Sequence, residues 1–233
     1  MRTFCESHRQ GWFRRLRPGL LLVMIGSALA ACGGGGGGND GGGGNPPGPP
    51  PPPPPPGLPP VSATAINIDA GQQIGVSRWS DGPTSTGGTG LPVGGVECLP
   101  VNHTFHEHAH VSVFLNGEQL AVPAAVGIVS LSPGNECFYA LHTHNRSGMI
   151  HIEAAAPATF TVGQFFDIWG QTLSGSEVAG LTGMPVVVYV TDNGTVTQAT
   201  GDFRNIQFRS HREITIQVGT AITEIPNYTW TGN

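Results

Sequence analysis

The sequence has no lysine, and only 11% of its 233 residues are charged. Five of its ten arginines stand before residue 18. From Cys32 onward, five arginines face fourteen carboxylates, so the net charge is near −9 with histidine neutral. A surface of this sign repels phosphate backbones and attracts cations, including metal ions. We therefore expect no nucleic-acid partner.

The apolar run at the N-terminus is too short to cross a membrane. Leu20 to Ala31 has twelve residues, whereas a transmembrane helix needs about 20. The run follows five arginines, which is typical of an export signal. Leu29-Ala30-Ala31-Cys32 resembles the lipobox of bacterial lipoproteins. The resemblance implies a signal peptide over 1–31, a lipid on the Cys32 thiol and a place in the cell envelope.

Gly33 follows the cysteine, where some bacteria use an aspartate to retain lipoproteins in the inner membrane. Its absence favours the outer membrane. Residues 32–60 are then almost entirely glycine and proline, and neither composition can bury a core. We interpret this segment as a tether, with a proline rod of about 45 Å at roughly 3.1 Å per residue. A docking ligand for a protein partner is the alternative. Residues 61–233 are predicted to form a single domain.

Cysteine is scarce. Cys5 leaves with the signal peptide and Cys32 takes the lipid, so only Cys98 and Cys137 remain for the domain. In an oxidising, exported setting this pair predicts a disulfide, which would contribute roughly 4 kcal/mol on the chain-entropy model. A role as metal ligands is the alternative, although no C-x-x-C spacing is present.

Strand patterns dominate the domain. Asn116-Gly117 and Asn193-Gly194 each separate two apolar runs and supply the positive φ angles of a two-residue hairpin turn. Thr161 and Gln164 resemble a helix capping box that precedes aromatic residues at helical spacing. We predict a mainly β, antiparallel, sandwich-like domain with one short helix near residues 162–170. The predicted strands are 61–69, 111–115, 118–122, 126–131, 138–144, 149–154, 185–191, 195–199, 206–208 and 213–218.

Histidines occur in two clusters at strand spacing. His106, His108 and His110 fall at alternate positions, and so do His142 with His144 and His151 with Glu153. Side chains at i and i+2 on a strand share a face, and a turn at 145–148 would place the last two pairs on adjacent strands. The pattern predicts a zinc or copper site, because both ions accept imidazole nitrogen. The candidate metal ligands are His106, His108, His110, His142, His144, His151 and Glu153.

Not every histidine can reach one ion, since positions i and i+4 lie about 13 Å apart along a strand. We expect His108 and His110 to supply the first pair, with His106 in reserve. Glu153 is either a ligand or an acceptor that orients an imidazole. His103 is assigned to a loop, and His211 to the surface or a strand. In the alternative interpretation the histidines form a buried polar seam without metal.

Several of these segments together resemble an uncharacterised family of exported bacterial proteins. They are His106-Glu-His-Ala-His110, Leu141-His-Thr-His144, Ile150-His-Ile-Glu153 and Phe160 to Trp169. The resemblance covers roughly residues 103–233 and implies a secreted β-rich domain with no established activity. That pattern has an aspartate where Asn145 stands here.

Three functions follow as hypotheses. The first is a lipid-anchored, metal-binding domain of the cell envelope. The second is a metal-dependent enzyme, either a hydrolase with Glu153 or Glu107 as general base or a copper oxidoreductase. No H-E-x-x-H or G-x-S-x-G motif assigns its catalytic residues. The third is a structural or interaction module without metal.

Overall fold

The structure is a computed structural model that describes residues 57–69, 71–82, 88–100 and 104–230. The predicted signal peptide, Cys32, most of the tether and His103 lie outside these residues. Among the described residues, no helix is long and apolar enough to span a membrane.

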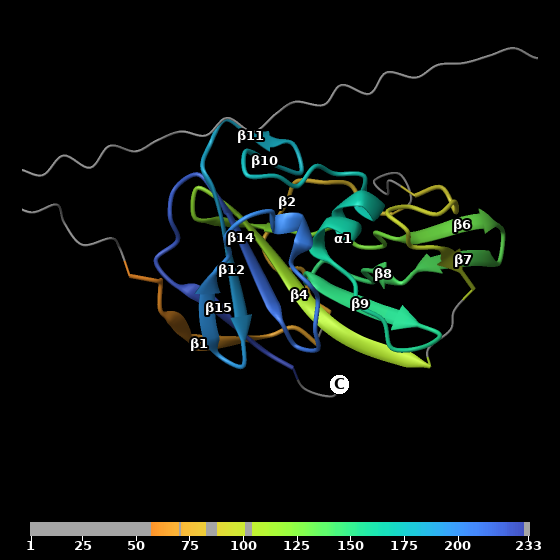
Figure 1. Ribbon diagram of the computed structural model, residues 1–233, viewed down its shortest axis with the longest axis horizontal. Helices are drawn as coiled ribbons and strands as arrows, with labels where there is room; N and C mark the ends of the chain where they lie inside the picture. Colours follow the sequence, from red (N-terminus) through yellow and green to blue (C-terminus); the bar gives the residue numbers. More distant parts are fainter. Residues whose placement is uncertain (1–56, 70, 83–87, 101–103, 231–233) are drawn as a thin grey trace, which may run out of the picture. The chain divides into compact units, whose positions relative to one another are not determined.

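One large sheet organises the domain, and its longest strand, β4 (Phe105–Leu115), runs through the centre (Figure 1). The first half of β4 pairs with β9 (Met149–Ala154), and its second half pairs with β5 (Glu118–Ala121). Both faces of β4 are buried from His108 to Phe114, as expected of a central strand. The other strands are β12 (Val186–Asp192), β13 (Thr195–Gln198), β14 (Glu213–Val218), β2 (Val76–Ser77) and β8 (Leu141–His142).

Both predicted Asn-Gly hairpins are present. Asn116 and Gly117 have φ angles of 51° and 86° between β4 and β5, and Asn193 and Gly194 have 48° and 76° between β12 and β13. Positive φ at both central positions is the geometry that matches the twist of paired antiparallel strands. These turns therefore fix the register of two strand pairs in the sheet, β4 with β5 and β12 with β13.

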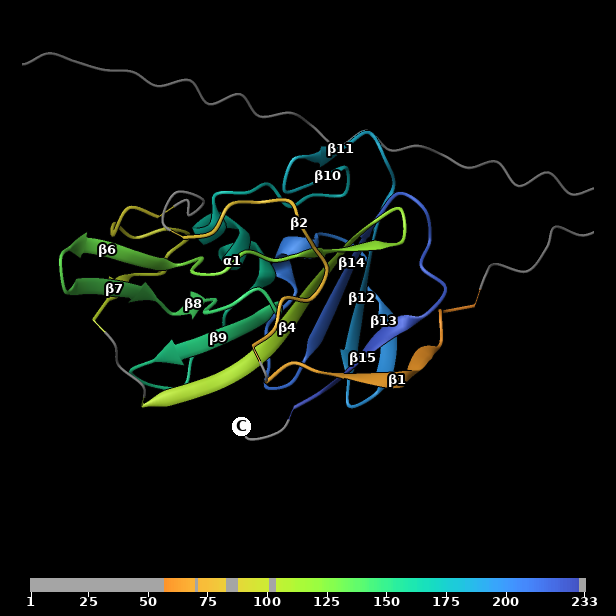
Figure 2. The same cartoon turned by 180° about the vertical axis from the view of Figure 1, so that it is seen from behind.

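Three smaller sheets complete the β structure, and the prediction of a mainly β, sandwich-like domain is confirmed (Figure 2). Antiparallel pairs predominate, but β14 runs parallel to β4, and β2 runs parallel to β5. The smaller sheets are β3 (Cys98–Leu99) with β7 (Asn135–Tyr139) and β6 (Ile128–Ser132), β1 (Val61–Asn67) parallel to β15 (Ile225–Thr229), and β10 (Glu177–Val178) with β11 (Leu181–Thr182).

The predicted helix is α1 (Val162–Trp169). Thr161 Oγ1 accepts a bond from the Gln164 N–H, and Gln164 Oε1 accepts one from the Thr161 N–H, which completes the capping box. Gly170 ends the helix in the left-handed conformation at φ 72°. Phe165, Phe166, Ile168 and Trp169 are fully buried, so the aromatic stripe is part of the core.

Two strand predictions are wrong in detail. Residues 206–208 are not a strand: a 3-10 helix, η2 (Phe203–Asn205), precedes them, and only Gln207 makes an isolated bridge to Thr161. The predicted strand 138–144 divides into β7 and β8, and β8 ends at His142 because Thr143 bonds to the loop at Pro123 and Val126 instead. The sequence pattern also misses β15, where proline and asparagine weaken the strand signal.

Cys98 and Cys137 form a disulfide between β3 and β7, across a sequence separation of 39 residues. Its stabilising effect comes mainly from restricting the unfolded chain, and a loop of this length corresponds to about 4 kcal/mol.

Replacing both cysteines with alanine should lower the free energy of unfolding by about 4 kcal/mol, measured by urea denaturation at pH 7. The double variant is compared with oxidised and with fully reduced wild-type protein. Reduction breaks the disulfide without removing a side chain. A double variant within 1 kcal/mol of the oxidised wild type would show that the link does not stabilise the domain.

Candidate metal centre

The pairing register of three strands brings the histidines together. His108 on β4 lies opposite His151 on β9, and His151 lies opposite His142 on β8. Two residues along, on the same face, His106 lies opposite Glu153. Side chains that are directly opposite on neighbouring strands have Cβ atoms about 5 Å apart on the same face. The sheet therefore presents one compact field of imidazoles and a carboxylate.

The opposite face of the same strands is apolar and fixes this arrangement. Ala109 pairs with Ile150, and Leu141 pairs with Ile152, and all four are buried in the main core. A slip of one residue would exchange the two faces and bury the imidazoles in that core. The hydrophobic residues thus determine where the histidines point.

The first donor group consists of His106, His108 and His151. Nε2 of His106 lies 2.9 Å from Nε2 of His108, and Nδ1 of His151 lies 3.3 Å and 3.1 Å from these two atoms. Tetrahedral ligands around zinc, at bond lengths of roughly 2.0–2.1 Å, lie about 3.3 Å apart. The three nitrogens therefore already stand at the mutual distances of metal ligands.

These three nitrogens cannot satisfy one another by hydrogen bonding. In a neutral imidazole each nitrogen is either an N–H donor or a lone-pair acceptor. Among three nitrogens in mutual contact, at least two must have the same role, so at least one contact sets two donors or two acceptors against each other. A cation bound by three lone pairs removes this conflict. The spacing of the three nitrogens therefore fits a metal ion.

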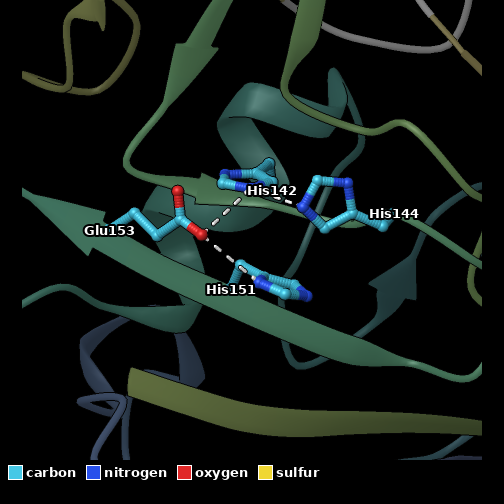
Figure 3. Close-up of side chains that lie close together, drawn as sticks. All are labelled: His142, His144, His151 and Glu153. Atoms are coloured by element: carbon cyan, nitrogen blue, oxygen red, sulfur yellow. Dashed lines mark hydrogen bonds and ion pairs between the residues drawn. The ribbon is translucent and has the colours of Figure 1, made fainter. Parts of the chain in front are cut away.

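The second donor group consists of His142, His144, His151 and Glu153, whose donor atoms lie within 4.8 Å of one another. Figure 3 shows these four side chains pointing toward a common centre from β8, β9 and the residues that follow β8. Nδ1 of His142 donates to the carbonyl oxygen of Tyr139 at 2.9 Å, which leaves the lone pair on Nε2. That Nε2 lies 3.2 Å from Nε2 of His144 and 3.9 Å from Oε1 of Glu153.

Glu153 links the two groups. Its Oε1 lies 3.3 Å from Nε2 of His106 and 3.4 Å from Nδ1 of His151, and its side chain is only 7% exposed. His151 belongs to both groups, so the two sets overlap at this residue. The arrangement offers nitrogen and carboxylate donors of the kind that zinc and copper accept.

Burial keeps the central imidazoles neutral. Desolvation, with a further contribution from His106, lowers the pKa of His108 to about 4. Desolvation and the surrounding histidines, His142 first among them, lower the pKa of His151 to about 2. Both rings therefore hold free lone pairs at neutral pH, and a metal ion does not have to displace a proton from either.

The loop between β8 and β9 is held in place by polar contacts. Buried Thr143 donates its hydroxyl to the carbonyl of Pro123 at 2.8 Å, so it points away from His142 and His144. Asn145 Oδ1 accepts from the Ser147 N–H at 2.9 Å and closes the turn. Arg146 forms a two-pronged ion pair with Asp81, with N–O distances of 2.8 Å. Asn145 serves the loop conformation and is not in either donor group.

His110 does not join the donor groups, although we expected it to pair with His108. Its Nε2 donates to the carbonyl of Ser147 at 2.8 Å, and its ring packs on Tyr228 with centroids 3.9 Å apart. The residue is fully buried, and desolvation lowers its pKa to about 4. His106 takes the predicted place beside His108, because the donors of β9, His151 and Glu153, lie opposite His108 and His106. The residue of β9 opposite His110 is Met149, which leaves His110 without a histidine or carboxylate across the strand pair.

His211, which we assigned to the surface or a strand, is exposed in the turn before β14. It lines a cavity of about 240 Å³ together with His106, Glu107, His108 and Ser210. Its φ of 57° is left-handed, and its N–H donates to the carbonyl of His108 at 2.7 Å. No sequence signal marks this position, since the contact depends on β14 lying parallel to β4.

Comparisons of the chain with models of protein families, with curated proteins and with solved structures find no match.

A buried carboxyl lies near this site. Glu213 pairs with His110 across β14 and β4, and it is 7% exposed. Desolvation raises its pKa to about 7, against bonds from the Trp230 side chain and the Tyr228 backbone that lower it. In the unfolded chain the group ionises near its ordinary pKa of 4.5. Between these values the folded state binds the extra proton, so this group's contribution to stability is lost as the pH rises through 7.

Glu213→Gln should therefore become more stable relative to wild type from pH 4.5 to pH 8, by on the order of 3 kcal/mol. The lowered pKa values of His108 and His151 make both proteins less stable at acid pH. This effect is the same in the two proteins and cancels in the difference between their free energies of unfolding. Urea denaturation across this range measures it, with Glu118→Gln on β5 as an exposed control. A difference that does not change with pH would contradict the assignment.

Proposed function

We propose that this domain binds one zinc or copper ion through His151 and the donors that surround it. The observation that carries the proposal is the triangle of His106, His108 and His151 nitrogens, with sides of 2.9–3.3 Å. Three neutral imidazoles in that arrangement oppose one another unless a cation lies between them. Glu153 adds one negative charge beside the ion.

His151 is the ligand common to both donor groups, and Glu153 contacts members of each. His106 and His144 are the exposed members, at the two sides of the cluster. These two residues would meet an arriving ion first. His108 and His142 are buried and would hold it in place.

We further propose that the domain works in the cell envelope, attached to the outer membrane rather than the inner membrane by a lipid on Cys32. The support is the lipobox-like Leu29 to Cys32, the glycine and proline tether that follows it, and a disulfide, which suits an oxidising compartment. A cation-attracting domain without lysine would collect metal from its surroundings.

A metal-dependent enzyme is the second candidate, favoured by the cavity of about 240 Å³ beside His106 and His108. A zinc ion held by three histidines keeps a fourth position for water or substrate and supplies a Lewis acid there. Hydrolase and oxidase assays of metal-loaded protein separate this candidate from simple binding. Metal-free protein that is purified without a histidine tag and binds no added zinc would favour a structural module instead.

Titration of metal-free protein with zinc should give one bound ion per chain. His151→Ala should weaken binding at least 100-fold, because it removes the nitrogen shared by both donor groups. Calorimetry with elemental analysis measures both quantities. His211→Ala is the matched control, since this histidine lines the adjoining cavity but lies in neither donor group.

The same titration distinguishes the two donor groups. Loss of affinity in His108→Ala but not in His142→Ala assigns the ion to the first group, and the reverse assigns it to the second. Wild-type affinity in all three ligand variants would refute the metal site.

Labelling of growing cells with radioactive palmitate should mark the wild-type protein and should fail to mark Cys32→Ser. The variant should also leave the membrane fraction, because a lipid chain is then missing from the anchor. Cys5→Ser is the control and should remain labelled. Equal labelling of Cys32→Ser would show that the lipobox resemblance is coincidental.

A further inference from the structure

A second cavity, of about 280 Å³, is lined by Glu153 and mainly by apolar side chains. Its walls include Leu99 from β3, Phe138 from β7 and Phe160 before α1, and Ala154 and Ala155 leave room at the end of β9. Binding cavities for drug-sized molecules usually have about 300–1,000 Å³. This cavity therefore suits a molecule with a single ring or a short branched chain.

Two strands that line the cavity are joined by a covalent link. Leu99 pairs with Phe138 across β3 and β7, and the Cys98–Cys137 disulfide ties the same two strands together. Leu99 lines the cavity and is 49% exposed, so much of its apolar surface is not buried in the core. A rigid apolar wall that remains accessible is the kind of surface that binds the apolar part of a small ligand.

The charges around the cavity have one sign. Among the described residues that line it, Glu97 and Glu153 are acidic and none is an arginine, and the chain has no lysine. The Glu153 side chain is 7% exposed, so its carboxylate acts where water screens weakly. An anionic ligand would be repelled here, whereas a cationic ligand would be attracted to both carboxylates.

We propose that this cavity binds a small amphipathic cation, namely a primary amine carried on an aromatic ring or a short branched alkyl chain. The apolar part lies against Leu99, Phe138 and Phe160, and the ammonium group donates to the carboxylates of Glu153 and Glu97. The site itself is independent of the metal. Its coupling to the metal rests on the proposed function, because Glu153 faces both the cavity and the histidines and cannot serve two cations fully.

The test measures by calorimetry the affinity of metal-free, full-length protein for phenethylamine. Phenethylamine should bind at least tenfold more tightly than 2-phenylethanol, and phenylacetate should bind most weakly. Ala155→Trp fills the cavity and should weaken phenethylamine binding at least tenfold, whereas Ala63→Trp, an exposed alanine on β1, should not change it. Equal binding of the amine and the alcohol, or no effect of Ala155→Trp, would overturn the proposal.

Charge and coupling are tested separately. Glu97→Gln should weaken phenethylamine binding about twofold to fivefold, as expected for an exposed ion pair, with exposed Glu136→Gln on β7 as the matched control. Equal losses in these two variants would overturn the role of Glu97.

Saturating zinc should weaken amine binding at least tenfold in wild type and have no effect in His151→Ala. If zinc does not bind at all, the metal site fails while amine binding persists. If zinc binds and amine affinity is unchanged, the sharing of Glu153 is refuted.

Discussion

The pairing register of β9 with β4 and β8 is the constraint on which the candidate site depends. Leu141, Ile150 and Ile152 on one face of these strands are buried in the main core, beside the aromatic residues of α1. Because side chains alternate along a strand, this apolar face leaves the histidines no other side to occupy. The geometry of the donors is therefore a consequence of hydrophobic packing, to which the aromatic residues of α1 contribute.

Electrostatics then separates the histidines by role. His110 is enclosed by Tyr228 and the Ser147 carbonyl and serves the core, whereas His108 and His151 are neutral but directed at other donors. Arg146, Arg204 and Arg212 each pair with an aspartate, and none of them lies in a donor group. A concentration of neutral nitrogens in a domain poor in positive charge favours metal binding over anion binding.

Local signals in the sequence predicted much of this structure. The Asn-Gly turns, the capping box of α1 and the i, i+2 histidine pairs each depend on neighbours in the chain, and each is present. Long-range pairing was not predictable. The parallel placement of β14 beside β4 brings His211 to the cavity, and the register with β9 decides that His106, rather than His110, accompanies His108. Those outcomes are set by tertiary packing, which strand propensity does not encode.

The parallel pairing of β1 with β15 has a mechanical consequence. β1 pairs with the last strand at Val61, opposite Ile225, and again from Ala65 to Asn67, opposite Asn227 to Thr229, with a register shift between the two stretches. A force applied along β1 loads these hydrogen bonds in shear, so that they must break together rather than one after another. A pull exerted on Val61 would thus be spread over this strand pair before it could reach the central sheet.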